Sequence, residues 1–291
     1  MLALQILVDG FAISSLYALG AMGFTLIFGV SGVLNLSHGG IMVVAALIGW
    51  LAAGELGLGV YLGTLIGIVA GLVSAYVTYL LVVRPIQRSR AIPREETEIF
   101  ILTGTLLWGI MIQVGMAYLF TDNPVTIRPM IDGVVQVFGV RTPRNEIMIA
   151  AICWIAIGLL WFLVNRTPAG KRLLAASINP RGLTLCGYEL SGIHLLVWTI
   201  YGVLAGVAGV LLASMLGISS ANAGQITASA FSIVVLGGLG SVSGSLIGAY
   251  VVGYLETITA YLIAPTLRPI PALILLVIVV YLRPQGLLGR R

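Results

Sequence analysis

The chain has 291 residues, of which 59% are hydrophobic and only 9% are charged, and its mean hydropathy is +1.09. Soluble domains carry about 25% charged residues, so this composition predicts a polytopic membrane protein and argues against a soluble domain. The formal charge of +5 does not require a nucleic-acid partner, because membrane proteins concentrate Lys and Arg in their cytoplasmic loops.

Eight apolar runs follow one another along the chain, and their lengths suit membrane helices better than the alternating strands of a barrel. They lie at about residues 4–30, 40–54, 57–83, 98–120, 145–165, 192–216, 229–255 and 269–282. The polar intervals between them are too short to form a soluble core. We therefore predict an all-α fold of about eight transmembrane helices in two loosely related halves, with residues 1–291 forming a single transmembrane domain.

The basic residues predict how the chain is oriented in the membrane, because cytoplasmic loops are enriched in Lys and Arg. Three basic groups are assigned to the cytoplasm: Arg84, Arg88, Arg90 and Arg94; Arg166, Lys171, Arg172 and Arg181; and Arg283, Arg290 and Arg291. The loop 121–145 must then lie outside, although it also contains basic residues.

Two glycine-rich patches interrupt the apolar pattern, one at residues 35–40 and one at 237–244. Each glycine inside a helix costs about 1 kcal/mol relative to alanine, so a cluster of glycines favours a break. The second patch contains Gly237, Gly238, Gly240 and Gly244.

The second patch also resolves a conflict in the number of crossings. An even number must connect the cytoplasmic loop 166–191 with a cytoplasmic C-terminus, yet three apolar runs lie between them. We therefore predict that the run 229–255 is a broken or re-entrant segment with a turn near 237–244.

The first patch places Asn35, Ser37 and His38 beside Gly39 and Gly40, between two apolar runs. Irregular backbone persists at membrane depth only where protein buries it or where it lines a wet cavity. Two interpretations remain open: a hinge or pore-lining patch, or a short polar turn in which His38 is tied to a neighbouring carbonyl.

Two acidic residues, Asp9 and Glu256, lie near the ends of apolar runs. We expect both at the membrane interface, where a charge costs less than at the bilayer centre.

The sequence contains no pattern typical of catalysis. The motifs of zinc proteases and serine hydrolases are absent, and the two histidines, His38 and His194, are far apart in the chain. Gly170-Lys171 is followed by Arg172, so the chain lacks the Ser or Thr of a P-loop. We expect no catalytic site, cofactor or metal in this chain, and energy for transport must come from a partner or an ion gradient.

The loop 166–191 is the best candidate for receiving that energy. Pro168 and Pro180 bracket a short amphipathic helix as start and stop signals. Its apolar surface consists of Leu173, Leu174, Ala176 and Ile178. The alternative is an ordinary basic loop that only fixes the topology.

Short motifs over nearly the whole chain carry a resemblance to a known family. They are Leu16-Tyr17-Ala18-Leu19, Phe24-Thr25-Leu26-Ile27-Phe28-Gly29, Asn35-Leu36-Ser37-His38-Gly39, Val83-Arg84-Pro85-Ile86, Val235-Leu236-Gly237-Gly238-Leu239-Gly240-Ser241, and Tyr281-Leu282-Arg283-Pro284-Gln285-Gly286-Leu287-Leu288-Gly289. Their order and spacing resemble the LivH-type permeases of branched-chain amino-acid ABC importers. Two departures are Ser37, where the family usually has Ala, and Leu174, which precedes Ala175 where Arg is typical.

The resemblance implies an importer with a second permease of the LivM type, two ABC ATPase subunits and a periplasmic substrate-binding protein. It would lie in the lipid of a bacterial inner (cytoplasmic) membrane, and the ATPase subunits would bind ATP and Mg. We expect branched-chain or other hydrophobic amino acids as the solute, although permeases for urea and short amides are closely similar.

The resemblance and the glycine breaks together predict two functional regions. The translocation pathway or hinge would contain Asn35, Ser37, His38, Gly39, Gly40, Gly237, Gly238, Gly240 and Ser241. The loop that couples to the ATPase would contain Gly170, Lys171, Arg172, Leu173, Ala175, Asn179 and Gly187.

A self-sufficient channel or ion-coupled carrier is the alternative from another class. It would favour carboxylates or polar columns inside the membrane, and mid-span acids are scarce here. A membrane-embedded enzyme ranks last, because no catalytic constellation supports it.

Overall fold

The computed structural model describes residues 1–89, 91–93, 95–120, 123–137, 139–283 and 285–288. Of the residues assigned above to the cytoplasm, Arg90, Arg94, Arg290 and Arg291 lie outside the described residues.

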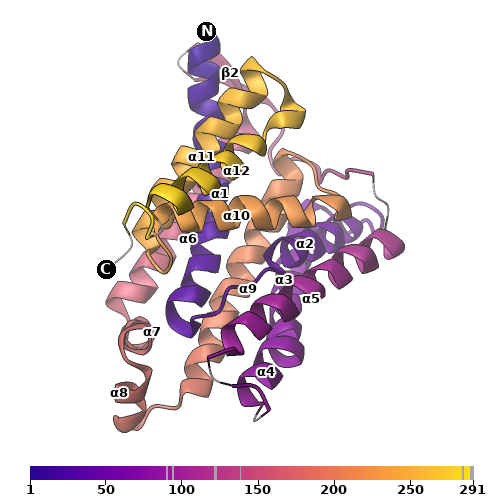
Figure 1. Cartoon of the computed structure of the whole chain (residues 1–291). Helices are drawn as coiled ribbons and strands as arrows, with labels where there is room; N and C mark the ends of the chain where they lie inside the picture. The colour runs from indigo at the N-terminus through magenta and orange to yellow at the C-terminus, as the bar shows by residue number, and fades with distance from the viewer. Residues whose placement is uncertain (90, 94, 121–122, 138, 284, 289–291) are drawn as a thin grey trace.

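Helices account for nearly all of the regular structure (Figure 1). The long helices are α1 (Leu2–Ser31), α3 (Val60–Thr78), α5 (Thr97–Leu119), α6 (Arg144–Arg166), α9 (Leu190–Met215) and α11 (Val242–Leu262). The shorter ones are α2 (His38–Ala53), α4 (Arg84–Arg88), α7 (Pro168–Ile178), α8 (Pro180–Leu185), α10 (Ala223–Gly237) and α12 (Ile270–Leu282). One π-helical segment, Tyr79–Val83, joins α3 to α4, and the 3₁₀ turns Ser220–Asn222 and Pro265–Leu267 precede α10 and α12.

Among the described residues, seven helical segments are long and apolar enough to cross a membrane, and α2 is a shorter apolar helix. The prediction of a polytopic helical protein with about eight crossings is therefore confirmed. One small addition is an antiparallel hairpin of β1 (Val134–Val137) and β2 (Val140–Pro143) in the loop before α6.

Local sequence explains where several helices begin and end. Gly32 ends α1 in the left-handed conformation, with φ of 65°, which glycine adopts without steric cost. The side chains of Thr167, Asn179 and Ser241 accept hydrogen bonds from the first turns of α7, α8 and α11, as N-cap residues do. Pro180 follows α7, as predicted, but it also starts α8, a second short helix that the sequence analysis did not predict.

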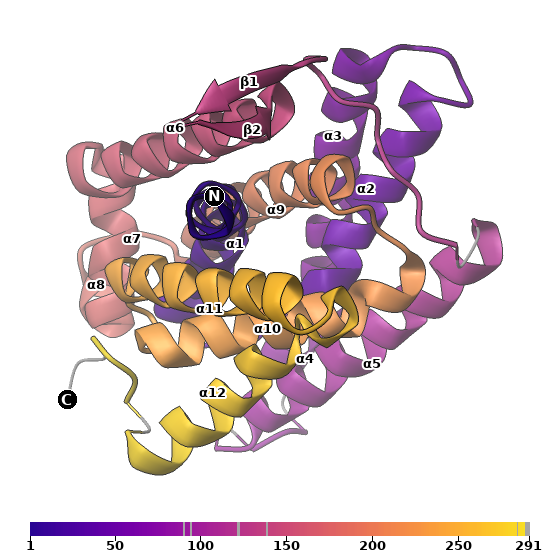
Figure 2. The same cartoon turned by 90° about the horizontal axis from the view of Figure 1, so that it is seen from above.

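The helices α1, α2 and α3 of the first half and α9, α10 and α11 of the second half make equivalent contacts. Helix α1 packs along α11, and α9 packs along α3. Likewise α2 packs on α3 while α10 packs on α11, and α1 meets α9 at the centre, as the view from above shows (Figure 2). Because α1 starts at the upper end of the molecule and α9 starts at the lower end (Figure 1), the halves are inverted relative to each other.

Glycines bring the packed helices into backbone contact. A Cβ atom at Gly67 would lie 2.5 Å from the Ala45 carbonyl oxygen, and one at Gly71 would lie 2.7 Å from the Cα of Gly206. These glycines recur at four-residue spacing on one face of α3, the arrangement that permits close helix approach in membranes.

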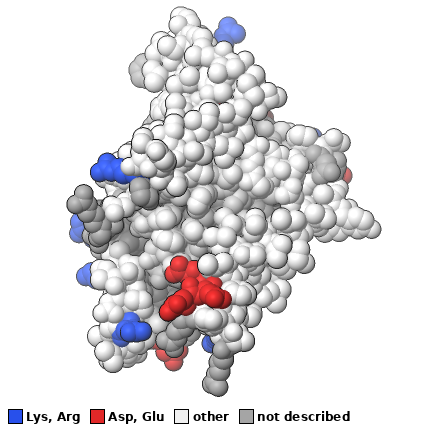
Figure 3. Space-filling model, in the orientation of Figure 1, with Lys and Arg blue, Asp and Glu red and all other residues white. Residues whose placement is uncertain are grey.

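Two of the three basic groups predicted to be cytoplasmic lie on the same end of the molecule. Helices α4, α7 and α8, which carry them, lie at the lower end, and the β1–β2 hairpin of the loop predicted to lie outside is towards the upper end (Figure 1). Most of the face shown in Figure 3 carries no charge, and the largest acidic patch on it lies towards the lower end. A large uncharged surface is what a lipid-facing protein requires.

Candidate functional site

The first polar patch forms a buried turn between α1 and α2. Asn35, Ser37 and His38 are each at most 1% exposed. The Asn35 side-chain oxygen accepts hydrogen bonds from the Ser37 backbone N–H at 3.2 Å and from the Ser37 hydroxyl at 2.6 Å. The backbone N–H of Leu36 donates to Thr105 Oγ1 at 3.1 Å. The turn is therefore an ordered part of the protein interior, where the side chain of Asn35 and the backbone N–H groups of Leu36 and Ser37 have partners within the protein.

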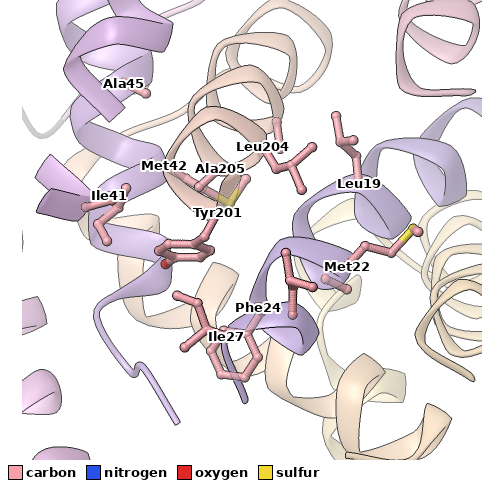
Figure 4. Close-up of a cluster of buried hydrophobic side chains, with 14 of the residues drawn as sticks. Leu19, Met22, Phe24, Ile27, Ile41, Met42, Ala45, Tyr201, Leu204 and Ala205 are labelled. Atoms are coloured by element: carbon pink, nitrogen blue, oxygen red, sulfur yellow. The ribbon is translucent and has the colours of Figure 1, made fainter. Parts of the chain in front are cut away.

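His38 is tied to helix α9, so the expectation of a backbone carbonyl partner was wrong. His38 Nδ1 lies 3.0 Å from the Tyr201 hydroxyl, which also accepts a hydrogen bond from Asn35 Nδ2 at 3.0 Å. Tyr201 is fully buried, with side chains of α1 and α2 around its ring (Figure 4). The sequence analysis missed Tyr201, for which the one signal was a hydroxyl group within an apolar run.

The two short helices α2 and α10 meet at their N-terminal ends. The Gly39 backbone N–H donates to Thr227 Oγ1 at 2.9 Å. A Cβ atom at Gly39 would lie 2.0 Å from the Ala223 carbonyl oxygen, so only glycine fits at this position. The junction joins the two inverted halves at the centre of the protein.

The second glycine patch forms the predicted break, because the run 229–255 is split into α10 and α11. Gly238 and Gly240 have φ values of 102° and 82°, which favour glycine strongly. Ser241 then caps α11 by accepting a hydrogen bond from the Gly244 backbone N–H at 3.1 Å. A Cβ atom at Gly237 would lie 2.3 Å from the carbonyl carbon of Gly244. The end of α10 and the start of α11 are therefore in backbone contact on either side of the break.

The two patches do not form one site. Gly39 contacts the start of α10, and Gly240 lies beyond its end, against Gly29 of α1. Since α10 has 15 residues, roughly 22 Å separates the two ends of this helix.

The loop 166–191 folds as two short helices with an inner and an outer side. Gly170 and Leu173 are buried, and a Cβ atom at Gly170 would lie 2.0 Å from the Leu163 carbonyl oxygen of α6. On the outer side the Arg172 guanidinium lies 4.9 Å from the centre of the Tyr188 ring. The other predicted residues of this loop are the exposed Lys171, the half-buried Ala175, the capping residue Asn179, and Gly187, whose φ is 84°.

A pocket of about 270 Å³ joins this loop to the second glycine patch. Its walls come from the end of α1, from α7 and from the link between α10 and α11, and they include Gly29, Leu173, Leu174, Ile178 and Gly240. The pocket therefore places α7 close to the segment that follows α10.

A groove of about 350 Å³ runs along α5 and α10. Gly40, Gly109, Gln113, Thr227 and Phe231 are among its lining residues. Of the first predicted patch, Gly40 reaches this groove, whereas Asn35, Ser37 and Gly39 do not line it. The groove gives the α2–α10 junction access to a surface of the protein.

A buried carboxylate, Glu256 of α11, lies against α1 and α10. Its side chain is 1% exposed and accepts hydrogen bonds from the Tyr17 hydroxyl at 2.6 Å and from the Ser229 hydroxyl at 3.2 Å. Asp9, expected at the membrane interface like Glu256, is also enclosed by helices and bonds to Gln5 and Tyr261. Apart from the Gln5–Asp9 bond, these contacts join residues that are distant along the chain, so local sequence does not predict them.

Comparison with known proteins identifies relatives along the whole chain. The sequence model of the family described as "Branched-chain amino acid transport system / permease component" matches residues 6–282. The chain is 25% identical over 295 residues to the high-affinity branched-chain amino acid transport system permease protein LivH of Escherichia coli (strain K12), covering 99% of this chain and 96% of that protein. It is 27% identical over 300 residues to the corresponding protein BraD of Pseudomonas aeruginosa, with the same coverage. It is 26% identical over 292 residues to a probable branched-chain amino acid transport permease LivH of Methanocaldococcus jannaschii, covering 95% of this chain and 89% of that protein.

Proposed function

The chain belongs to the family of permease components of branched-chain amino acid transport systems, and we propose that it forms part of the transmembrane pathway of an ATP-driven importer for branched-chain or other hydrophobic amino acids. It is a multi-span membrane protein and a transporter component by family. In the proposed complex, separate ATPase subunits bind ATP and Mg and hydrolyse ATP, so this chain itself needs no cofactor.

One observation carries the proposal for how the chain works. Helix α10 meets the start of α2 at its N-terminal end, through Thr227, and the link after its C-terminal end shares a pocket with α7, lined by Gly240 and Leu173. A rigid helix transmits a displacement along its length, so a push on α7 and α8 that closes this pocket would reach the centre of the protein. This connection favours coupling to an external motor over a passive channel.

The groove along α5 and α10 is our candidate for the wall of the pathway. Its lining combines small residues, Gly40 and Gly109, with the polar side chains of Gln113 and Thr227. A second permease subunit, of the LivM type, would cover this face and close the pathway. The polar backbone of the α2 start would then adjoin a wet cavity, where irregular backbone is tolerated.

The remaining partners and the location follow from the same proposal. The importer would contain two ABC ATPase subunits, one of which would dock on α7 and α8 of this chain, whose exposed residues include Leu174, Ile178 and Leu185. A periplasmic substrate-binding protein would dock on the opposite face, and the complex would lie in a bacterial inner membrane. Binding of nucleic acid is not part of the proposal.

The first test is purification of the tagged chain from its native membranes in mild detergent, with mass spectrometry of the co-purified proteins. We expect two ATPases and a second permease, and ligand screens on the associated binding protein would then identify the solute. Binding of leucine, isoleucine or valine would support the substrate assignment, whereas binding of urea or short amides would replace it.

A chain that purifies alone and moves solute into liposomes without ATP would overturn the proposal. It would favour the self-sufficient channel or ion-coupled carrier. Liposomes with an imposed ion gradient and without one would then separate the two remaining mechanisms.

A further inference from the structure

A small cavity of about 50 Å³ lies between α1, α2, α9 and α10, beside the junction of the two short helices. Its polar lining residues are Tyr17, His38, Gln225 and Ser229. Gln225 is also exposed at the protein surface, which gives the cavity a route to solvent. A cavity needs about 10–15 Å³ of such space for each water molecule, so this one has room for about three.

The hydrogen bonds around Tyr201 determine which nitrogen of His38 carries the proton. The Asn35 side-chain oxygen accepts two hydrogen bonds from Ser37, which orients the Asn35 amide so that its NH₂ group donates to the Tyr201 hydroxyl. Tyr201 then has one proton left, and the acceptor within reach is His38 Nδ1, at 3.0 Å. A neutral imidazole with an accepting Nδ1 carries its proton on Nε2.

The His38 Nε2–H is buried and has no hydrogen-bond acceptor among the described residues. It faces α1, because a Cβ atom built on Gly20 would lie 3.7 Å from Nε2. A buried donor without an acceptor destabilises the folded state, so a partner inside the cavity would stabilise the protein.

The opposite wall of the cavity offers oxygen atoms to such a partner. The hydroxyl groups of Tyr17 and Ser229 both use their protons to bond the Glu256 carboxylate. Their oxygen atoms retain free lone pairs and can accept further hydrogen bonds. The cavity therefore presents one donor on α2 and two acceptors on α1 and α10.

We propose that this cavity is a binding site for about three ordered water molecules, one of which accepts a hydrogen bond from the His38 Nε2–H. The water cluster would complete a hydrogen-bonded path from Glu256 through Tyr17 to His38, Tyr201 and Asn35. This path joins the two inverted halves, and α2 and α10 can then move relative to each other by exchanging bonds with water. The proposal concerns the resting protein and does not depend on the transported solute.

The test uses the small number of histidines in the chain. In a His194→Gln protein labelled with ¹⁵N-histidine and reconstituted in lipid bilayers, all imidazole signals come from His38. We expect solid-state NMR to show Nε2 protonated and Nδ1 bare, with magnetisation transfer from water to the Nε2 proton.

A Gly20→Ala variant tests the water site directly. The added methyl group would meet Ala208, His38 Nε2 and Met42 Sδ at 3.7–3.8 Å, so it fits without a clash and occupies the space beside Nε2. We expect the transfer from water to be lost while Nε2 stays protonated. Gly115→Ala is the matched control, because no atom lies within 4 Å of its added methyl group, and it should leave the signal unchanged.

Tyr201→Phe tests the proton assignment separately. It removes the donor to Nδ1, so we expect a population with Nδ1 protonated to appear, whereas Tyr79→Phe, beside Trp198, should have no such effect. A parent protein with a bare Nε2, or with a protonated Nε2 that receives nothing from water, would overturn the proposal. So would a Gly20→Ala protein that retains the full transfer from water.

Discussion

Gly286 near the C-terminus lies in backbone contact with Gly238, since a Cβ atom at Gly286 would be 2.5 Å from both the N and the Cα of Gly238. The following residues, Leu287 and Leu288, donate backbone hydrogen bonds to the carbonyls of Leu236 at 2.7 Å and Gly237 at 3.0 Å. The last carbonyls of a helix have no partner within the helix. The C-terminal segment therefore closes the end of α10 at the second glycine break.

A Gly286→Ala substitution should destabilise this closure. The new Cβ would clash with Gly238, and φ at Gly286 is 73°, which costs an L-residue roughly 1–2 kcal/mol without any clash. We expect a lower midpoint of thermal unfolding in detergent. Gly57→Ala is the control, because its φ is 64° and no atom lies within 4 Å of the added methyl group. Equal losses in the two variants would show that contact with Gly238 contributes nothing.

Gly240→Ala should reduce uptake more than it reduces stability. A methyl group at Gly240 would be 3.5 Å from Gly29, which is an ordinary contact, while φ is 82°. We expect a stability loss of about 1–2 kcal/mol together with impaired solute uptake, because this link joins α10 to α11 and lines the pocket beside α7. Gly59→Ala has the same φ of 82° and open space around it, so it should lose similar stability and keep its uptake. Normal uptake with Gly240→Ala would argue against a role for this link in coupling.

The bond between Tyr17 and Glu256 can be measured with a double-mutant cycle. Tyr17→Phe and Glu256→Gln each weaken the 2.6 Å hydrogen bond, so their effects on unfolding should not add. We expect a coupling free energy of about 0.6–1.7 kcal/mol, the range found for polar contacts inside membrane proteins, from reversible unfolding in mixed micelles. A cycle of Tyr79→Phe with Glu256→Gln should give a coupling near zero. Additive effects of the first pair would contradict the bond.

Leu185→Glu should weaken docking of the proposed ATPase subunits. Leu185 ends α8 and is 89% exposed, so the charge should not disturb the fold of this chain. We expect less ATPase to co-purify, at an unchanged thermal midpoint of the isolated chain. Leu56→Glu, in the loop between α2 and α3 where Leu56 is 63% exposed, should leave co-purification unchanged. Equal recovery of the ATPases with Leu185→Glu would place their contact elsewhere.

Much of the architecture could be predicted from the sequence, because each feature depends on local composition. Outside the run 229–255, the apolar runs predicted the long helices to within a few residues. The glycines at 237–244 predicted the division of that run into α10 and α11, but α10 begins at 223 and α11 ends at 262, beyond the predicted bounds. Pro168 and Pro180 predicted the bounds of α7. A membrane excludes water from the backbone, so hydropathy and helix-breaking residues determine where helices begin and end.

The candidate site depended on contacts that the sequence does not encode locally. His38 could be singled out as a polar residue in an apolar region, but its partner Tyr201 lies 163 residues away. Tyr17 and Glu256 are separated by 239 residues, and each one alone is an ordinary residue near an apolar run. Their pairing follows from the packing of α1 along α11 and of α9 beside α2.

The sequence by itself determined a helical membrane protein, its two glycine breaks and a short helix in the loop 166–191, because period, hydropathy and turn residues act over a few neighbouring positions. Only the tertiary structure decided that the N-terminal ends of α2 and α10 meet, that the C-terminal segment closes α10, and that one small cavity is lined by His38 and by Tyr17 and Ser229, whose hydroxyl groups bond Glu256. These relationships depend on side-chain packing between the inverted halves. A shift of one helix by one turn along its neighbour would bring different residues into contact.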